Sequence, residues 1–215
     1  DMELLMLHHA GCMPGLRELD VSCSYDGRPL PSVSSCVEVL QRCTHLTRLD
    51  LQGRIIDEAA MSQLRVGFTG LSRLRTLIMS ANPSSAGGAR WLAEALTHTP
   101  ALTRLDVSFA QLDGAAMAAL EPAFAHLSQL QVLDMSYNPL GADGAAALAR
   151  ALSHTPTLLV LRLGGTSLGA AAMTSLEPAL SRLTHLQTLY VGGNPFGPDG
   201  AACLARALSH MPALM

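Results

Sequence analysis

The chain has 215 residues, of which 49% are hydrophobic and 14% charged, and its formal net charge at pH 7 is −3. This composition is typical of a folded domain, and a chain of this length can build a core without a metal ion or disulfide bonds. A slightly acidic chain suits neither the phosphate backbone of nucleic acids nor an anionic membrane, so we expect neither as the main partner. No apolar run approaches the about 18 residues of a membrane-spanning helix.

A repeated motif, L-x-x-L-x-(L/V/M), organises the chain. It begins at Leu16, Leu46, Leu74, Leu102, Leu130, Leu158 and Leu186, with an unfinished copy at Leu214. Such regular self-similarity is the signature of a repeat architecture. We therefore predict one solenoid over 1–215. Residues 1–15 would be the tail of a preceding helical unit or a cap, 16–213 seven full repeats, and 214–215 the start of a truncated eighth.

Each unit begins as a strand. In the unit from Leu130, Leu133 and Met135 point inward while the residues between them face out, which is the alternation of a half-buried strand. Asn138 and the proline after it predict a turn. Asp143 then stands where the N-cap of a helix is expected.

A helix completes each unit. Leu148 and Leu152, four residues apart, would face the core from an Ala-rich segment of high helix propensity. Two unit types alternate, because the ninth position holds Asn82, Asn138 and Asn194 in one set and Arg54, Ala110 and Thr166 in the other. In the second set, Pro122 and Pro178 lie inside the helical stretch and predict a shorter or bent helix.

These repeats resemble the leucine-rich-repeat superfamily, specifically its ribonuclease-inhibitor-like subfamily with long alternating units. The resemblance implies an α/β fold: a right-handed horseshoe with a parallel sheet on the concave face and helices on the convex face. Similar repeats occur in ribonuclease inhibitor, in NOD-like receptor sensor domains and in Ran GTPase-activating protein. Asn82, Asn138 and Asn194 match the family's asparagine that bonds turn backbone. Ala110 cannot do so, so we expect the asparagine ladder in alternate units only.

Enzyme motifs are absent. The sequence contains no P-loop, dinucleotide fingerprint, nucleophile elbow or H-E-x-x-H pattern, so we expect no enzyme, no catalytic residue, no cofactor and no small-molecule substrate. A histidine column could be read as a metal or pH-sensing ladder, but no carboxylate or cysteine column accompanies it, and histidine also suits a helix C-terminus. We favour the structural interpretation. The column holds His98, His126, His154 and His210.

Cysteine usage favours a reducing compartment. The five cysteines are an odd number with no C-x-x-C pair, so we expect a cytoplasmic protein. Four of them fall in the first fifth of the chain, at spacings that match neither a disulfide framework nor a zinc site. Cys36 and Cys203 share columns with leucine or alanine, which predicts that they are core residues.

The outward strand positions supply the candidate site. Their fifth-position column reads Asp20, Asp50, Ile78, Asp106, Asp134, Arg162 and Tyr190. Adjacent strands lie about 4.8 Å apart, so the column predicts neighbouring like charges. One interpretation is that Arg48 and Arg104 neutralise these aspartates on a merely solvated surface. The other is that acidic pairs beside exposed aromatics anchor a partner with a basic surface.

We expect the second interpretation, a non-enzymatic scaffold that binds a protein through its concave strands. The predicted protein-binding residues are Arg48, Asp50, Arg104, Asp106, Phe109, Asp134, Tyr137, Arg162 and Tyr190. Glycine pairs at 164–165 and 192–193 would leave the C-terminal part of this face open to a partner's backbone. The alternatives are a regulator of a GTPase or another enzyme, or the ligand-sensing repeats of a NOD-like receptor.

Overall fold

Strands and helices alternate along the chain, as the repeats predict. The computed structural model describes residues 15–23, 29–30 and 32–214. The strands are β1 (Glu18–Asp20), β2 (Arg48–Asp50), β3 (Thr76–Ile78), β4 (Arg104–Asp106), β5 (Val132–Asp134), β6 (Val160–Arg162) and β7 (Thr188–Tyr190). The helices are α2 (Val33–Arg42), α3 (Glu58–Leu64), α4 (Ala86–Leu96), α5 (Gly114–Leu120), α6 (Gly141–Leu152), α7 (Ala170–Leu180) and α8 (Gly197–Leu208).

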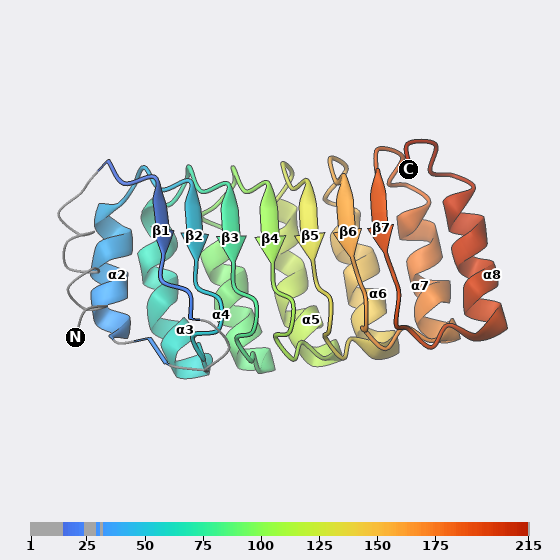
Figure 1. The fold of residues 1–215 in the computed structure, drawn as a ribbon, viewed down its shortest axis with the longest axis horizontal. Helices are drawn as coiled ribbons and strands as arrows, with labels where there is room; N and C mark the ends of the chain where they lie inside the picture. Colours follow the sequence, from blue (N-terminus) through green and yellow to red (C-terminus); the bar gives the residue numbers. More distant parts are fainter. Residues whose placement is uncertain (1–14, 24–28, 31, 215) are drawn as a thin grey trace.

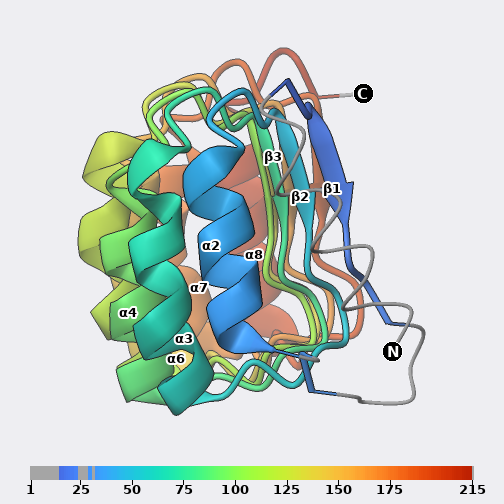
Figure 2. The same ribbon diagram turned by 90° about the vertical axis from the view of Figure 1, so that its left-hand side faces the viewer.

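The molecule has two layers. The strands form one parallel sheet in sequence order, and the helices cover one side of it (Figure 1, Figure 2). Neighbouring strands are about 4.8 Å apart and packed helices about 8–10 Å apart, so the stack must curve with the sheet on its inner side. Accordingly, the row of helices is wider than the row of strands in Figure 1. We call the surface of the sheet that faces away from the helices the sheet face. It corresponds to the predicted concave face.

The leucine columns form the core between the layers. Leu130, Leu133 and Met135 are fully buried, and Leu148 and Leu152 meet them from α6. Burying one such side chain contributes about 1.5–3 kcal/mol. The predicted inward and outward positions of the strands are therefore confirmed, and the motif that repeats in the sequence is the motif that fills the core.

Each ninth-position asparagine serves two units. Buried Asn138 accepts hydrogen bonds from the backbone N–H groups of Ala110 and Leu112, both at 3.0 Å, in the preceding unit. Its amide donates to the carbonyls of Val107, at 2.9 Å, and Met135, at 2.8 Å. Asn82 and Asn194 make the same contacts. Turns without their own asparagine are thus held by the next unit, which explains why the ladder needs only alternate positions.

Helix geometry in the second unit type follows phenylalanine more closely than proline. Two 3-10 segments, η1 (Arg65–Gly70) and η2 (Glu121–His126), continue α3 and α5. η1 contains no proline, but Phe68 and Phe124 occupy the same column and are fully buried. The third unit has Leu180 there, and α7 continues as an α-helix through Pro178 to its end at Leu180. The expectation of a shorter helix is met at Pro122, whereas α7 runs through Pro178 and has the same length as α4, 11 residues.

The helix caps also differ from the sequence-based assignment. Asp143 and Asp199 lie in the first turns of α6 and α8 and are not N-caps. The residues that cap with a side chain are Ser32, Asp57, Ser85 and Asp113. In the repeat alignment Asp57, Ser85 and Asp113 share a column with Gly141 and Gly197, two residues before Asp143 and Asp199. An acidic residue in the first turn still complements the helix dipole.

Cys36 and Cys203 are buried core residues, as their columns predict. Burial raises the pKa of the Cys36 thiol to about 11, so this group stays protonated and behaves as a small apolar side chain. The assignment of residues 1–14 to a preceding unit, and of Met215 to a following one, lies outside the described residues.

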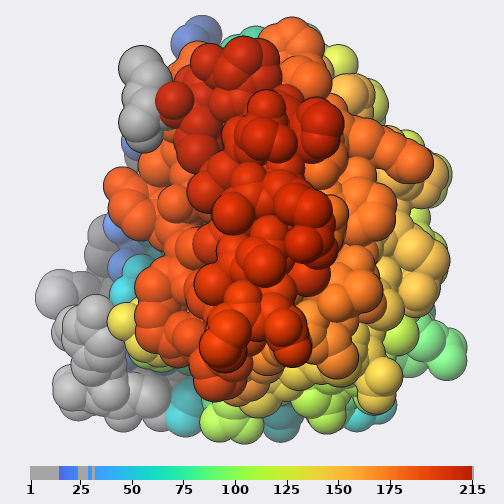
Figure 3. Space-filling view, turned by 90° about the vertical axis from the view of Figure 1, so that its right-hand side faces the viewer, coloured from blue at the N-terminus to red at the C-terminus, as the bar shows by residue number. Residues whose placement is uncertain are grey.

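The last described helix forms the C-terminal end of the stack (Figure 3). Leu204 and Leu208 of α8 are half-buried, whereas their counterparts Leu148 and Leu152 in α6 are buried. The difference arises because α6 packs between α5 and α7, whereas α8 packs against α7 alone among the described helices.

The two-unit role of Asn138 predicts a large cost of its loss. Asn138→Ala leaves four buried backbone groups without their partner, so we expect the free energy of unfolding to fall by about 3 kcal/mol or more. Urea denaturation followed by circular dichroism measures this. Gln129→Ala, at an exposed position directly before the same unit, is the control and should stay within about 0.5 kcal/mol of the parent. A loss under about 1 kcal/mol for Asn138→Ala would contradict the role.

Candidate interaction surface

The strand register builds the fifth-position column that the sequence predicts. Asp20 lies beside Asp50, and Asp106 beside Asp134. Ile78 separates the two pairs, and Arg162 and Tyr190 continue the column.

Each aspartate of the column stabilises the turn that follows its strand. One carboxylate oxygen accepts the backbone N–H two residues later: Asp106 from Ser108 at 3.1 Å and Asp134 from Ser136 at 3.0 Å. Ser108 adds its hydroxyl at 2.7 Å. These bonds engage one oxygen of each carboxylate, so only the other oxygen is available for a further contact.

Arginines pair with the remaining oxygens. Arg48 contacts Asp50 at 2.7 Å, Arg104 contacts Asp106 at 3.7 Å, and Arg162 reaches across to Asp134 at 3.5 Å. The first two pairings follow the neutralising interpretation of the sequence. Arg162 was not identified as a partner of Asp134, although both were candidate site residues. The acidic column is therefore partly balanced along its length.

Asp50 is less accessible than the other candidates. The residue is only 6% exposed, and burial raises the pKa of its carboxyl group despite the contact with Arg48. The neighbouring Asp20 is exposed, and hydrogen bonds from Ser22 lower its pKa. A partner approaching this part of the sheet face would meet Arg48 before Asp50.

Two aromatic rings stack just beyond the strands. Phe109 and Tyr137 occupy the same turn position after β4 and β5, and their ring centroids are 4.3 Å apart at an interplanar angle of 16°. They are 54% and 59% exposed. Offset stacking of this kind contributes about 0.5–1.5 kcal/mol, but it leaves most of both rings in water. We call Phe109 and Tyr137 the aromatic pair.

The aromatic pair sits in strained backbone. Phe109 and Tyr137 have φ values of +55° and +58°, which cost a residue with a side chain about 1–2 kcal/mol. Small residues fill this turn position in the other units: Cys23 in the first unit, and Gly53, Ala81, Gly165 and Gly193, these four at positive φ. A Cβ atom at Gly165 would come within 2.9 Å of the Tyr137 ring, so Gly165 also makes room for that ring.

A second aromatic group lies at the last strand. Tyr190 is 52% exposed, and the guanidinium carbon of Arg162 lies 5.3 Å from its ring centroid. Arg162 therefore joins Tyr190 to Asp134 in one polar and aromatic group on β5, β6 and β7. With the aromatic pair after β4 and β5, the exposed aromatic side chains of the sheet face gather in its C-terminal half.

The sequence signal for the aromatic pair was in the repeat alignment. Glycine at the same turn position in other units indicates a positive φ, and a phenylalanine or tyrosine there is an exception. The alignment also predicts that the rings of adjacent units are neighbours. The stacking itself depends on side-chain orientation, which spacing does not determine.

Three residues of the histidine column, His98, His154 and His210, lie one residue beyond a helix C-cap, whereas His126 is the last residue of η2. The backbone N–H groups of His98, His154 and His210 donate to helix carbonyls, and their side chains are exposed. No group of three His, Cys, Asp or Glu side chains that could hold a metal ion occurs within the described part of the chain. In the same residues, no helix has the length and apolar character needed to cross a membrane.

Comparison with known proteins supports a leucine-rich-repeat fold. The family model for the leucine-rich repeat matches residues 126–149 and 182–205. The solved C-terminal domain of tropomodulin from Caenorhabditis elegans is 15% identical with a TM-score of 0.55, covering 83% of this chain and 92% of that one. A TLR13 complex with the RNA ssRNA13 is 17% identical with a TM-score of 0.45, covering 93% of this chain and 33% of that one. The search of curated proteins gave no match.

The repeats, the alternating strands and helices, and the family model that matches two segments together support a leucine-rich-repeat fold. The narrower assignment to the ribonuclease-inhibitor-like subfamily stays a prediction.

The opposite pKa shifts of Asp20 and Asp50 predict opposite pH dependences. The pKa of Asp50 is higher in the folded state than in the unfolded state, so ionisation of this carboxyl group destabilises the fold. The free energy of unfolding of the parent, minus that of Asp50→Asn, should therefore fall as pH rises through the carboxyl range. For Asp20, whose pKa is lowered, the same difference against Asp20→Asn should rise with pH. Urea denaturation of the three proteins between about pH 3 and pH 7 measures both differences. Parallel trends would contradict the assignment.

Proposed function

We propose that this chain is a non-enzymatic scaffold that binds a partner protein through its sheet face. Leucine-rich-repeat folds generally serve as protein-interaction scaffolds. The proposed contact residues are centred on the aromatic pair, Arg162 and Tyr190, with Asp106 and Asp134 behind them. Arg48, Asp50 and Arg104 would lie at the periphery.

The aromatic pair carries the proposal. Its two rings are exposed, occupy backbone that favours glycine, and fill a position where other units place small residues. Stacking of the rings contributes about 0.5–1.5 kcal/mol, less than the combined strain of about 1–2 kcal/mol at each of the two residues, so stability alone does not account for this choice. Aromatic side chains are the residues most enriched at the energetic centres of protein interfaces.

The surrounding charges favour a partner with arginine or lysine side chains. A cation can stack on the face of an aromatic ring, and cation–π contacts contribute about 0.5–2 kcal/mol. Asp106 and Asp134 are half-buried on β4 and β5, the strands that the aromatic pair follows, and the carboxylate oxygen of each that its turn does not use faces an arginine at 3.7 Å and 3.5 Å. A cation of the partner could share these two oxygens. A preformed rigid surface of this kind loses little conformational entropy on binding.

Affinity capture from the native host tests the proposal. The baits are the parent chain, Phe109→Gly/Tyr137→Gly and the control Ile55→Gly/Val66→Ala. The control is matched, because Ile55 and Val66 are exposed apolar residues away from the sheet face and Ile55 also has a positive φ, of +46°. Glycine relieves strain at these positions, so all three baits should have similar thermal unfolding midpoints.

We expect a protein captured by the parent and the control to be reduced at least tenfold with the Phe109→Gly/Tyr137→Gly bait, measured by quantitative mass spectrometry. Equal capture by all three baits would exclude the aromatic pair from binding. The identity of the captured protein then distinguishes a passive scaffold from a regulator that acts by contact on an enzyme.

A further inference from the structure

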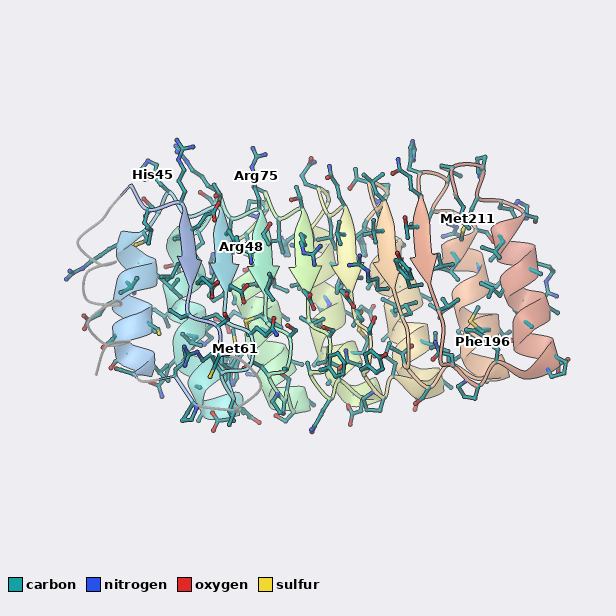
Figure 4. The ribbon with its side chains drawn as sticks, in the orientation of Figure 1. His45, Arg48, Met61, Arg75, Phe196 and Met211 are labelled. Carbon is teal, nitrogen blue, oxygen red and sulfur yellow. The ribbon has the colours of Figure 1, made fainter. Side chains whose placement is uncertain are left out.

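A cluster of basic side chains occupies a different part of the surface. The loops that lead from each helix into the next strand form one long edge of the molecule. Arg17, Arg42, His45, Arg73 and Arg75 lie on this edge in the first described units, and we call them the basic edge cluster. Figure 4 shows His45 and Arg75 at this edge, with their side chains directed away from the ribbon.

Backbone hydrogen bonds place the cluster on adjacent strand entries. The N–H of Thr47 donates to the carbonyl of Arg17 at 2.7 Å, and the N–H of Arg75 donates to the carbonyl of Thr47 at 2.8 Å. Arg17 and Arg75 are therefore two strand spacings apart, about 10 Å at the backbone. His45 and Arg73 precede Thr47 and Arg75 by two residues, so they lie on the same edge.

The positive charge of the cluster is unbalanced. All five side chains are exposed, and among the described residues none of the four arginines makes an ion pair or a side-chain hydrogen bond. The loop segments 15–17, 43–47 and 71–75 contain no aspartate or glutamate. Two arginines near other helix ends behave differently: Arg150 and Arg206 pair with glutamates of the neighbouring unit.

Helix capping explains only part of the cluster. Arg42 lies in the last turn of α2, where a cation complements the helix dipole. Arg17, Arg73 and Arg75 lie on the strand side of their loops, and the dipole effect fades within one helical turn. These three arginines therefore have no structural partner that accounts for their position.

We propose that the basic edge cluster binds an acidic segment of a partner protein. An extended polypeptide rises about 3.3 Å per residue, so carboxylates at alternate positions are about 7 Å apart. A few glutamates or aspartates in such a segment span the distance from Arg17 to Arg75 and reach Arg73 and His45 beside them. Arginine suits this role because its planar guanidinium can hold a carboxylate with two hydrogen bonds.

Other anionic occupants fit less well. Glu18, Asp20 and Asp50 lie on the first two strands directly below the edge, so a broad polyanion such as nucleic acid or a membrane surface would be repelled there, whereas a narrow peptide along the edge would not. The cluster also has no aromatic side chain on which a base could stack.

A second copy of the chain is a poor partner too. On the opposite edge, the carboxylates of Asp57, Asp113 and Glu58 are already bonded to Ala60, Ala116 and Ser85. The acidic groups there without such bonds, Asp143 and Asp199, lie toward the other end of the stack. If two copies of the chain with the same orientation packed edge to edge, Asp143 and Asp199 of one copy would not reach the basic edge cluster of the other.

Fluorescence anisotropy with a labelled ten-residue oligoglutamate peptide at low ionic strength tests the proposal. The variant Arg73→Gln/Arg75→Gln removes two charges from the cluster. Its control, Arg90→Gln/Arg182→Gln, removes two exposed arginines from helix α4 and from the far end of the same edge. We expect binding about five- to tenfold weaker for the cluster variant and within about twofold of the parent for the control. Far-ultraviolet circular dichroism confirms that both variants are folded.

Parallel titrations use a ten-nucleotide thymidine strand and vesicles of phosphatidylserine and phosphatidylcholine, and sedimentation velocity reports self-association. The proposal is supported if oligoglutamate binds most tightly and the cluster variant alone loses it. It is overturned by no binding of oligoglutamate, by equal losses in the two variants, or by tighter binding of DNA or vesicles. Self-association that the cluster variant abolishes would overturn it as well.

Discussion

Buried asparagines at alternate units hold the turns of this solenoid. The side chain of Asn138 joins the turn after β4 to the turn after β5 through four backbone hydrogen bonds. These four turn groups bond to the asparagine side chain and not to the backbone of a neighbouring strand, and burying them unpaired would be costly. One amide satisfies two units, so adjacent units form a pair, and the 56-residue alternation seen in the sequence has a physical origin.

The same constraint fixes the proposed binding surface. Asn138 bonds to Val107 and Ala110, which flank Phe109, and its own backbone follows Tyr137 directly. Both aromatic residues are thus held at positive φ by a buried group that they do not contact through their rings. The free energy that the asparagine contributes offsets the strain of the aromatic pair. Rigidity behind the surface and exposure in front of it are the properties that an interaction scaffold requires.

Periodicity made most of the fold predictable. A spacing of 28 residues fixed the strand columns, so the positions of Asp106 and Asp134 side by side followed from arithmetic and from the sheet spacing. The buried leucines followed in the same way. Helix details were less accessible, because the 3-10 segments depend on how Phe68 and Phe124 fill the core and not on the proline that marks two of the three units.

The candidate site was only partly predictable for a related reason. Asp50 and Asp106 occupy equivalent positions, yet Asp50 is buried and Asp106 is half-buried, since their exposure depends on neighbouring side chains in other units. The contacts of Arg162 with Asp134 and Tyr190 are also cross-strand contacts between side chains. Sequence columns identify which residues are adjacent. They do not determine rotamers, and rotamers decide which groups stack, pair or remain exposed.

The central claim is that two strained aromatic side chains, fixed by a buried asparagine, form the centre of a protein-binding surface. An experimental structure of the chain bound to the partner that it captures would test this most directly. The account predicts partner atoms within about 4 Å of both Phe109 and Tyr137, with the bonds of Asn138 unchanged. A partner bound to the helices, with the aromatic pair still exposed to solvent, would contradict it.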